Sequence, residues 1–381
     1  MFTSDGAPDS PIMRPRVLYG ALFAFFSCSG GRFTAPFLES QASFGEAEIG
    51  LAMAIQSALV SLLGTPAGAF SDRLQRRKKN GRVYVMTCGL VISTIAFLMH
   101  MMGNKIESLS GSKDWAVKWY FFLRILYASG ISMINPVLDG ITLAHLQREG
   151  SSKSDFGKER LHGAIWWAVA NIIIGICIDK WGFNVMYAAT LVTCLLSILA
   201  IFGYAREQRN LFVAQDHDKR EQDSLIVRDE ELENYHAVSI SETVERKASV
   251  RGCALDGSSE GANSLSIVEL FVLIFGSVYG FGLIVSCVTL TMGTSVVESL
   301  IFLFFERLGA SWTVCGLSVL VTVMFEVPIF HFAPDLLRLL GVSCLQHIAC
   351  LAYITRVVGY TFIPSNHSYW ILFLEPLVCY L

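Results

Sequence analysis

Charged residues are scarce in this chain of 381 residues. Asp, Glu, Lys and Arg make up 16% of it, and 53% of the residues are apolar, whereas soluble proteins average about 25% charged residues. Residues 205–264 alone hold 21 of the 61 charged residues, so the rest of the chain is poorer still. This composition excludes a soluble enzyme and a disordered chain. Repeated apolar runs of near membrane-spanning length instead indicate a polytopic membrane protein.

Several motifs and signals are also missing. Nine of the ten cysteines lie in apolar runs, so they do not form the disulfide framework of a secreted protein. The net charge of −3 gives no basis for binding nucleic acid. The polar segment 1–15 precedes an apolar run long enough to span and stay in the membrane, so we expect no cleaved signal peptide. The chain has no His-Glu-x-x-His and no paired Cys-x-x-Cys, and we therefore expect no enzyme, no cofactor and no metal site.

Apolar runs between polar breaks predict about ten membrane spans. Backbone polar groups in lipid must be satisfied internally, and no run alternates like a barrel strand, so the spans are expected to be helices. The run 266–305 is too long for one helix and holds either one span near 281–305 or two. The last run is too short to cross, so the chain looks C-terminally truncated. The predicted spans are 16–38, 48–70, 83–103, 116–143, 161–178, 183–204, 266–305, 312–333, 342–363 and 369–381.

Basic residues set the predicted direction of the spans. The break 72–82 is rich in Arg and Lys and is therefore expected in the cytosol. Counting from it places the N-terminal segment 1–15 in the cytosol and the acidic break 39–48 outside. The polar segment 205–264, rich in Asp, Glu, Ser and Lys, is expected to be a disordered cytosolic linker. Which membrane holds the protein stays open.

The stretch from Gly68 to Lys78 resembles the signature between helices two and three of the major facilitator superfamily, although Gln75 stands where the usual glycine is. Gly68 allows two helices to approach closely. Asp72, at a helix end, is able to accept hydrogen bonds from a neighbouring helix N-terminus and from Arg73 or Arg76, forming a latch that breaks as two halves rock. The alternative interpretation is a topology anchor made of basic residues.

Residues 135–167, and later stretches around Glu298, Pro328 and Glu375, resemble the "associated" branch of the same superfamily. That branch is similar to lactose-permease-like, nucleoside-symporter-like and macrophage MHC-receptor-like proteins. The resemblance implies two six-helix bundles around a central cavity lined by helices one, four, seven and ten. We therefore expect an all-α integral membrane protein of the major facilitator fold, with a second bundle that is incomplete.

The same resemblance divides the chain. It implies an N-terminal six-helix bundle over 16–204 and a partial C-terminal bundle of about four helices over 265–381.

Charged residues inside spans cost roughly 2.5–3.5 kcal/mol each and are functional candidates. A proton-coupled carrier needs a carboxylate that loads and unloads a proton between two exposed states. A cavity arginine binds anionic or hydroxylated groups by paired hydrogen bonds. The proton-coupling candidates are Glu298, Glu326 and Glu375, and the substrate candidates are Arg32 and Arg124.

Two pairings of charged residues are also predicted. Asp139 and Arg160 lie near the cytosolic ends of two spans and are candidates for a gate pair. Glu326 and Arg356 are candidates for a pair that merely holds helices together. The one glycosylation sequon begins at Asn366, close to the membrane.

These observations predict a secondary active transporter of a small polar organic solute, sugar- or nucleoside-like, with protons as the coupling ion. Its expected partners are the lipid bilayer, the solute and protons, and it is expected to be a symporter. The alternative is a multi-pass membrane receptor or binding protein that does not transport.

Overall fold

A computed structural model of the protein describes residues 15–42, 44–78, 80–110, 113–150, 156–209, 276–365 and 367–377. These residues form helices and no strand, which confirms the predicted all-α fold. Within them, eight helices are long and apolar enough to cross a membrane. The protein is therefore a multi-pass membrane protein. The eight candidate spans are Glu46–Arg77, Gly81–Met102, Lys113–Arg148, Phe156–Trp181, Val185–Arg209, Gly280–Arg307, Trp312–Ile329 and Asp335–Tyr360.

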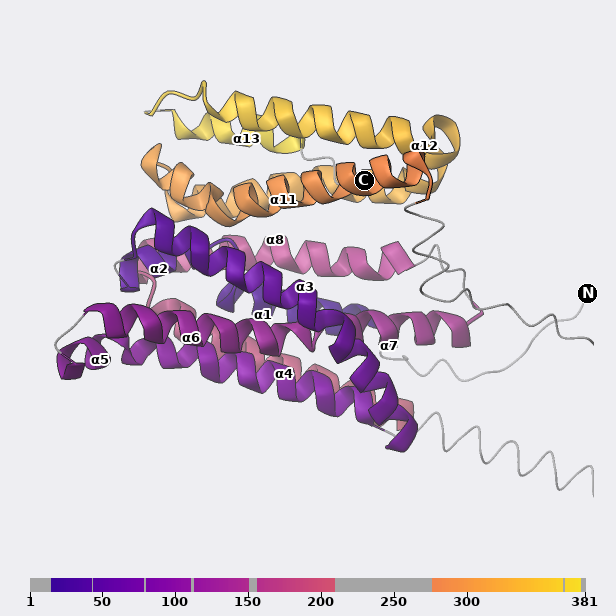
Figure 1. Cartoon of the computed structure of the whole chain (residues 1–381), viewed down its shortest axis with the longest axis horizontal. Helices are drawn as coiled ribbons and strands as arrows, with labels where there is room; N and C mark the ends of the chain where they lie inside the picture. Colours follow the sequence, from indigo (N-terminus) through magenta and orange to yellow (C-terminus); the bar gives the residue numbers. More distant parts are fainter. Residues whose placement is uncertain are drawn as a thin grey trace, which may run out of the picture. The chain divides into compact units, whose positions relative to one another are not determined.

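The first part of the chain supplies most of the helices, coloured indigo to magenta in Figure 1. Another helical segment, Val185–Arg209, follows α8. The preceding helices are α1 (Pro15–Ser29), α2 (Thr34–Ala42), α3 (Glu46–Arg77), α4 (Gly81–Leu98), η1 (Met99–Met102), α5 (Gly103–Ser110), α6 (Lys113–Ser132), α7 (Asn135–Arg148) and α8 (Phe156–Trp181).

The last part of the chain, coloured orange to yellow, holds two long helices and three short ones. Gly341 interrupts α12 with a φ of 72°, a left-handed conformation that glycine adopts without a steric penalty. This kink lies inside the second of the two candidate spans of α12, Asp335–Tyr360. The elements are α11 (Val278–Arg307), α12 (Trp312–Tyr360), η3 (Ser368–Trp370), α13 (Ile371–Leu374) and η4 (Glu375–Leu377).

The chain separates into two compact units. One comprises Met1–Ala205 with Ser286–Leu381 and contains nearly all of the described helices. The other is Arg206–Val285, of which the structure describes only the end of one helix and the start of α11. Most of the predicted linker 205–264 lies outside the described residues.

The predicted first span, 16–38, is not one continuous helix. The chain leaves α1 after Ser29 and re-enters a helix at Thr34. The hydroxyl of Tyr127 lies so close to Gly30 that a side chain there would collide with it. The glycine thus allows α6 to approach the chain at the break, and Arg32 lies within the break.

The predicted span 116–143 is likewise divided, into α6 and α7. Pro136 explains the division, because it lies in the first turn of α7 and has no N–H group to donate back to the preceding turn. In the stretch 266–305, the described residues form a single helix, α11, whereas 266–275 lie outside the described residues. The final predicted span, 369–381, contains only the short helices η3, α13 and η4 where the structure describes it.

Helix α8 packs against both α1 and α12. Gly175 and Gly316 explain the close contact with α12. A side chain at Gly175 would collide with the backbone carbonyl of Trp312, and one at Gly316 with that of Asn171. The two helices therefore meet backbone to backbone, so the N-terminal helices contact the C-terminal ones along this line.

Candidate functional site

Arg32 and Glu298 form an ion pair between distant parts of the chain. Arg32 lies in the break between α1 and α2, and Glu298 lies in the C-terminal third of α11. Both side chains are largely buried, with 11% and 17% of their surface exposed. The break in the first span therefore brings the guanidinium of Arg32 to the carboxylate of Glu298 on the C-terminal helices.

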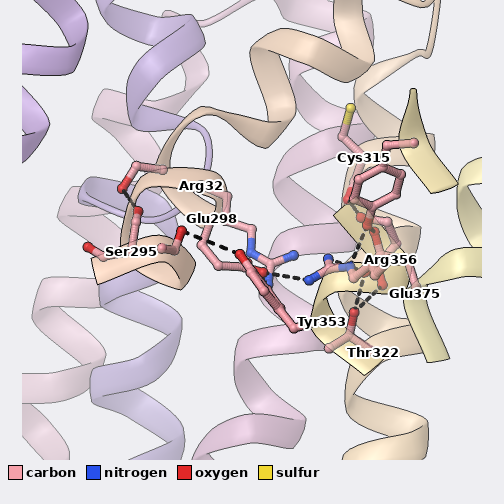
Figure 2. Close-up of polar contacts among 12 residues, drawn as sticks. Arg32, Ser295, Glu298, Cys315, Thr322, Tyr353, Arg356 and Glu375 are labelled. Atoms are coloured by element: carbon pink, nitrogen blue, oxygen red, sulfur yellow. Dashed lines mark hydrogen bonds and ion pairs between the residues drawn. The ribbon is translucent and has the colours of Figure 1, made fainter. Parts of the chain in front are cut away.

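Arg356 lies at the centre of the same cluster and is fully buried. Its Nη1 donates to Glu298 Oε1 at 2.8 Å, and its Nη2 donates to Glu375 Oε2 at 2.7 Å. The charges thus alternate along a chain that runs from Arg32 through Glu298 and Arg356 to Glu375, as Figure 2 shows. Two cations and two anions cancel, which allows this group of charges to lie among apolar helices.

Glu375 is fully buried and has two further donors. Tyr360 donates to Oε1 at 2.8 Å, and Thr322 donates to Oε2 at 2.6 Å. Tyr360 also accepts a hydrogen bond from Arg356 Nε and lies one helical turn after it. We define the charge network as Arg32, Glu298, Thr322, Arg356, Tyr360 and Glu375.

A cavity of about 540 Å³ adjoins the charge network, since Arg32 and Thr322 belong to both. Aromatic and apolar side chains form most of its wall, and Glu326 supplies a carboxylate. Trp167 and Phe23 offer ring surfaces to a bound solute. The cavity is lined by Phe23, Arg32, Gly157, Arg160, Leu161, Ala164, Trp167, Val319, Thr322, Val323 and Glu326.

The predicted pairing of Glu326 with Arg356 is wrong. Arg356 binds Glu298 and Glu375, while Glu326 faces the cavity. The reason is geometric: α11 meets the second half of α12 through hydrogen bonds at Gln346 and Tyr353, and η4 packs against α12, so Glu298 and Glu375 both lie within hydrogen-bonding distance of Arg356.

Polar contacts join the ends of several helices near the start of α12. Asp179, near the end of α8, accepts hydrogen bonds from the backbone N–H groups of Trp312 and Thr313 at 2.9 and 2.8 Å. A carboxylate there satisfies the otherwise unpaired donors of the first turn of α12 and complements its dipole. Arg307 at the end of α11 pairs with Glu46 at the start of α3 at 2.8 Å. In the predicted orientation these contacts lie on the outer side.

Other polar contacts join the helices at their predicted cytosolic ends. Asp139 accepts a hydrogen bond from Tyr19 at 2.8 Å, and Arg16 pairs with Glu159 at 2.8 Å. The predicted gate pair of Asp139 with Arg160 is not formed within 4 Å in this part of the structure; Arg160 instead lines the cavity. Asp139 lies on α7 and meets α1 first, so Tyr19 takes the place predicted for Arg160.

The predicted latch has a different partner from the one expected. Asp72 pairs with Arg82 at the start of α4, at 2.8 Å from Nη2, rather than with Arg73 or Arg76. Arg82 also donates to the carbonyl of Gly140 on α7 at 3.3 Å. One side chain therefore joins α3, α4 and α7.

Gly68 contributes to the same junction. A Cβ added at Gly68 would lie 3.3 Å from Pro136 Cβ of α7, tighter than ordinary contact. The glycine thus permits the close helix approach that the sequence predicted.

Arg124 does not line the cavity, although the sequence predicted it there. Its side chain is fully buried, contacts Gln56 on α3 and lies over the ring of Tyr127. The face of α6 that carries it turns into the N-terminal helices. The glycosylation candidate Asn366 lies outside the described residues.

Sequence analysis missed three members of the site. Tyr360 follows Arg356 by four residues, a spacing that places both on one helix face and was a usable signal. Thr322 and Arg82 gave no comparable signal, because only the helix arrangement brings them to Glu375 and Asp72.

Comparison with known proteins agrees with this fold. The model of the MFS_1 like family matches residues 16–379. The chain is also similar to a solved structure titled "Crystal structure of nucleoside transporter NupG", with a TM-score of 0.61 and 12% sequence identity over 96% of this chain and 77% of that chain. At that identity the likeness shows the fold alone. The family match and the fold together support a membrane transporter, and the chain belongs to the MFS_1 like family.

Proposed function

We propose that the protein is a proton-coupled secondary transporter of a small polar organic solute that is sugar- or nucleoside-like. The observation that carries the proposal is the ion pair of Arg32 with Glu298 beside the cavity. It joins the bundle proposed for 16–204 to the partial bundle proposed for 265–381, so movement of the two against each other separates its partners.

Separation of this pair supplies a reason for proton binding. When Arg32 moves away, Glu298 loses one of its two guanidinium neighbours, and an opposite charge nearby is what favours its charged form. A proton then takes the place of Arg32. When the halves return, Arg32 favours release of the proton. Glu298 is therefore the proposed coupling residue, and Arg356 keeps it in position.

The cavity supports a solute with both polar and flat apolar parts. Trp167 and Phe23 offer ring surfaces, whereas Arg32 and Glu326 offer a donor and an acceptor at the wall. With the predicted orientation, the contacts at Asp179 and Arg307 close the outer side. Arg160 lines the cavity near the cytosolic start of α8. We propose that this arrangement is the inward-facing state, with the N-terminus in the cytosol.

Transport is tested with the chain reconstituted in proteoliposomes and radiolabelled uridine or glucose as the probe. An imposed proton gradient should drive accumulation by the wild type. Glu298→Gln keeps the shape and mimics the protonated side chain, so accumulation should collapse while exchange of internal for external solute survives. Loss of both activities would indicate a structural role for Glu298. Binding of either probe without any flux would support a receptor in place of a transporter.

Glu326→Gln is the matched control, because Glu326 lies on the cavity wall but outside the charge network. It should weaken solute binding and leave the dependence of accumulation on the proton gradient in place. If Glu326→Gln abolished coupling and Glu298→Gln did not, the coupling residue would be Glu326.

A further inference from the structure

Arg124 is a buried cation that the proposed transport mechanism does not use. It lies in α6, and its side chain has no exposed surface. Its Nη2 contacts Gln56 Oε1 on α3, and its Cζ lies 4.7 Å from the centre of the Tyr127 ring. The Nε and Nη1 atoms are buried and have no hydrogen-bond partner among the residues that the structure describes. Two donors of one guanidinium therefore lack an acceptor.

The charge of Arg124 also lacks a balancing anion among the residues that the structure describes. Arg32 and Arg356 each pair with a carboxylate, whereas no carboxylate of the described residues pairs with Arg124. A buried charge that has lost its partner typically destabilises a protein strongly, so such groups are normally paired. The amide of Gln56 and the ring face of Tyr127 are neutral and compensate the charge only in part.

A buried water would satisfy the donors without balancing the charge. One candidate for a water-bridged acceptor is His100 Nε2, which is buried and has no partner among the described residues. His100 Nδ1 lies 2.9 Å from the carbonyl of Ala96, so in the neutral ring this nitrogen donates and Nε2 accepts. A water between Arg124 and His100 would thus complete the hydrogen bonds, but the guanidinium would remain a net cation among apolar helices.

We propose that Arg124 holds a small monovalent anion, a halide or a carboxylate, within the helices α3 and α6. Gln56 and Tyr127 form two walls of the site. Gln56 is half-buried, so its side chain is the one able to reorient and admit the ion. The site is separate from the solute cavity, whose lining does not include Arg124. The anion would stabilise the N-terminal helices whether or not the protein transports.

The first test measures thermal unfolding of the purified protein in detergent at constant ionic strength. Sodium gluconate, whose anion is too large for a buried site, is replaced stepwise by sodium chloride or sodium formate. A bound anion stabilises the folded state in proportion to the logarithm of its concentration above Kd, so Tm should rise with chloride, formate or both. A larger response to chloride assigns a halide site, and a larger response to formate assigns a carboxylate site. A Tm that is equal in all three salts would overturn the proposal.

Two variants locate the site. Arg124→Gln should abolish the Tm response to chloride and formate. Lys118→Gln removes an exposed cation from the same helix and should keep the full response. An unchanged response in Arg124→Gln would overturn the assignment.

Gln56→Glu keeps the proposal testable if Arg124→Gln does not fold. Its carboxylate would stand where the amide oxygen now contacts Arg124, and would act as a tethered anion. The variant should have a higher Tm than the wild type in gluconate and should no longer respond to chloride or formate. A lower Tm in gluconate, or a preserved anion response, would contradict the proposed site.

Discussion

Replacing Arg356 by methionine should destabilise the protein more than almost any other single change. The side chain is fully buried and donates to Glu298, Glu375 and Tyr360. Methionine fills similar volume but donates nothing. Glu375 would remain fully buried with only hydroxyl donors, and Glu298 would retain Arg32.

The magnitude follows from the burial of Glu375. Breaking a buried ion pair by removing one partner costs about 3–5 kcal/mol. Since Glu298 keeps one guanidinium and is partly exposed, we expect Arg356→Met to fall near the lower end, about 3 kcal/mol. That corresponds to a loss of about two orders of magnitude in the folding equilibrium constant.

Unfolding of the purified protein by denaturant in detergent measures this change, and a double-mutant cycle identifies its origin. Glu375→Gln removes the stranded charge, so the double variant Arg356→Met with Glu375→Gln should recover much of the stability lost in Arg356→Met. Arg307→Met breaks an ion pair with Glu46 whose arginine is half exposed, and should cost less than about 1 kcal/mol. Equal costs for Arg356→Met and Arg307→Met, or strictly additive effects in the cycle, would refute the reasoning.

Three further predictions concern the conformational change and the orientation. Asp72→Asn and Arg82→Gln break the same ion pair, so each should slow solute exchange to a similar extent without reducing the amount of protein in the membrane. The double variant should exchange solute no more slowly than either single variant. Additive effects on the exchange rate would show that the two residues have independent roles. Asp179→Asn weakens the cap on α12, so a thiol reagent applied from outside should label a cysteine introduced at the cavity wall by Ala164→Cys faster than in an Ala164→Cys protein that keeps Asp179. An unchanged rate would remove Asp179 from the outer closure. An epitope tag within 73–82 should be reachable only from the cytosol and one within 39–48 only from outside, and the reverse pattern would invert the proposed orientation.

The fold was largely predictable from the length and spacing of the apolar runs. A run of about 20 apolar residues has few alternatives to a membrane helix, because its backbone must satisfy its own hydrogen bonds. The breaks inside the first and fourth predicted spans were less accessible. Pro136 was a usable signal for the second break. The break at Gly30 depends on the approach of Tyr127 from another helix, which hydropathy does not record.

The charged residues of the charge network were predicted as candidates, but their pairings were not. The free-energy cost of a charge inside the membrane is enough to single out Arg32, Glu298, Arg356 and Glu375, because charged residues are rare in apolar helices. Which of them meet depends on the neighbours of each helix and on the rotation of each helix about its axis. That is why Arg356 binds Glu298 and Glu375 rather than Glu326. Arg124 was placed on the cavity for the same reason, although its face of α6 points away from it.

The latch at Asp72 shows that even a contact between residues close in sequence was not predictable from the sequence. Asp72 has four basic residues within the next six positions of the chain, yet it pairs with Arg82. The reason is that α4 begins at Gly81 and returns alongside α3, so Arg82 comes back to the level of Asp72. Nearness in sequence favoured Arg73 and Arg76, whereas the turn between the helices determines the contact.

The most direct test of the central claim measures protons and solute together. Proteoliposomes that contain a pH-sensitive dye, with no imposed gradient, receive external uridine or glucose. If Glu298 carries a proton with the solute, entry of the transported probe should acidify the interior, and Glu298→Gln should allow exchange without acidification. Entry of solute by the wild type with no change of internal pH would contradict proton coupling, and acidification that persists in Glu298→Gln would contradict the role assigned to Glu298.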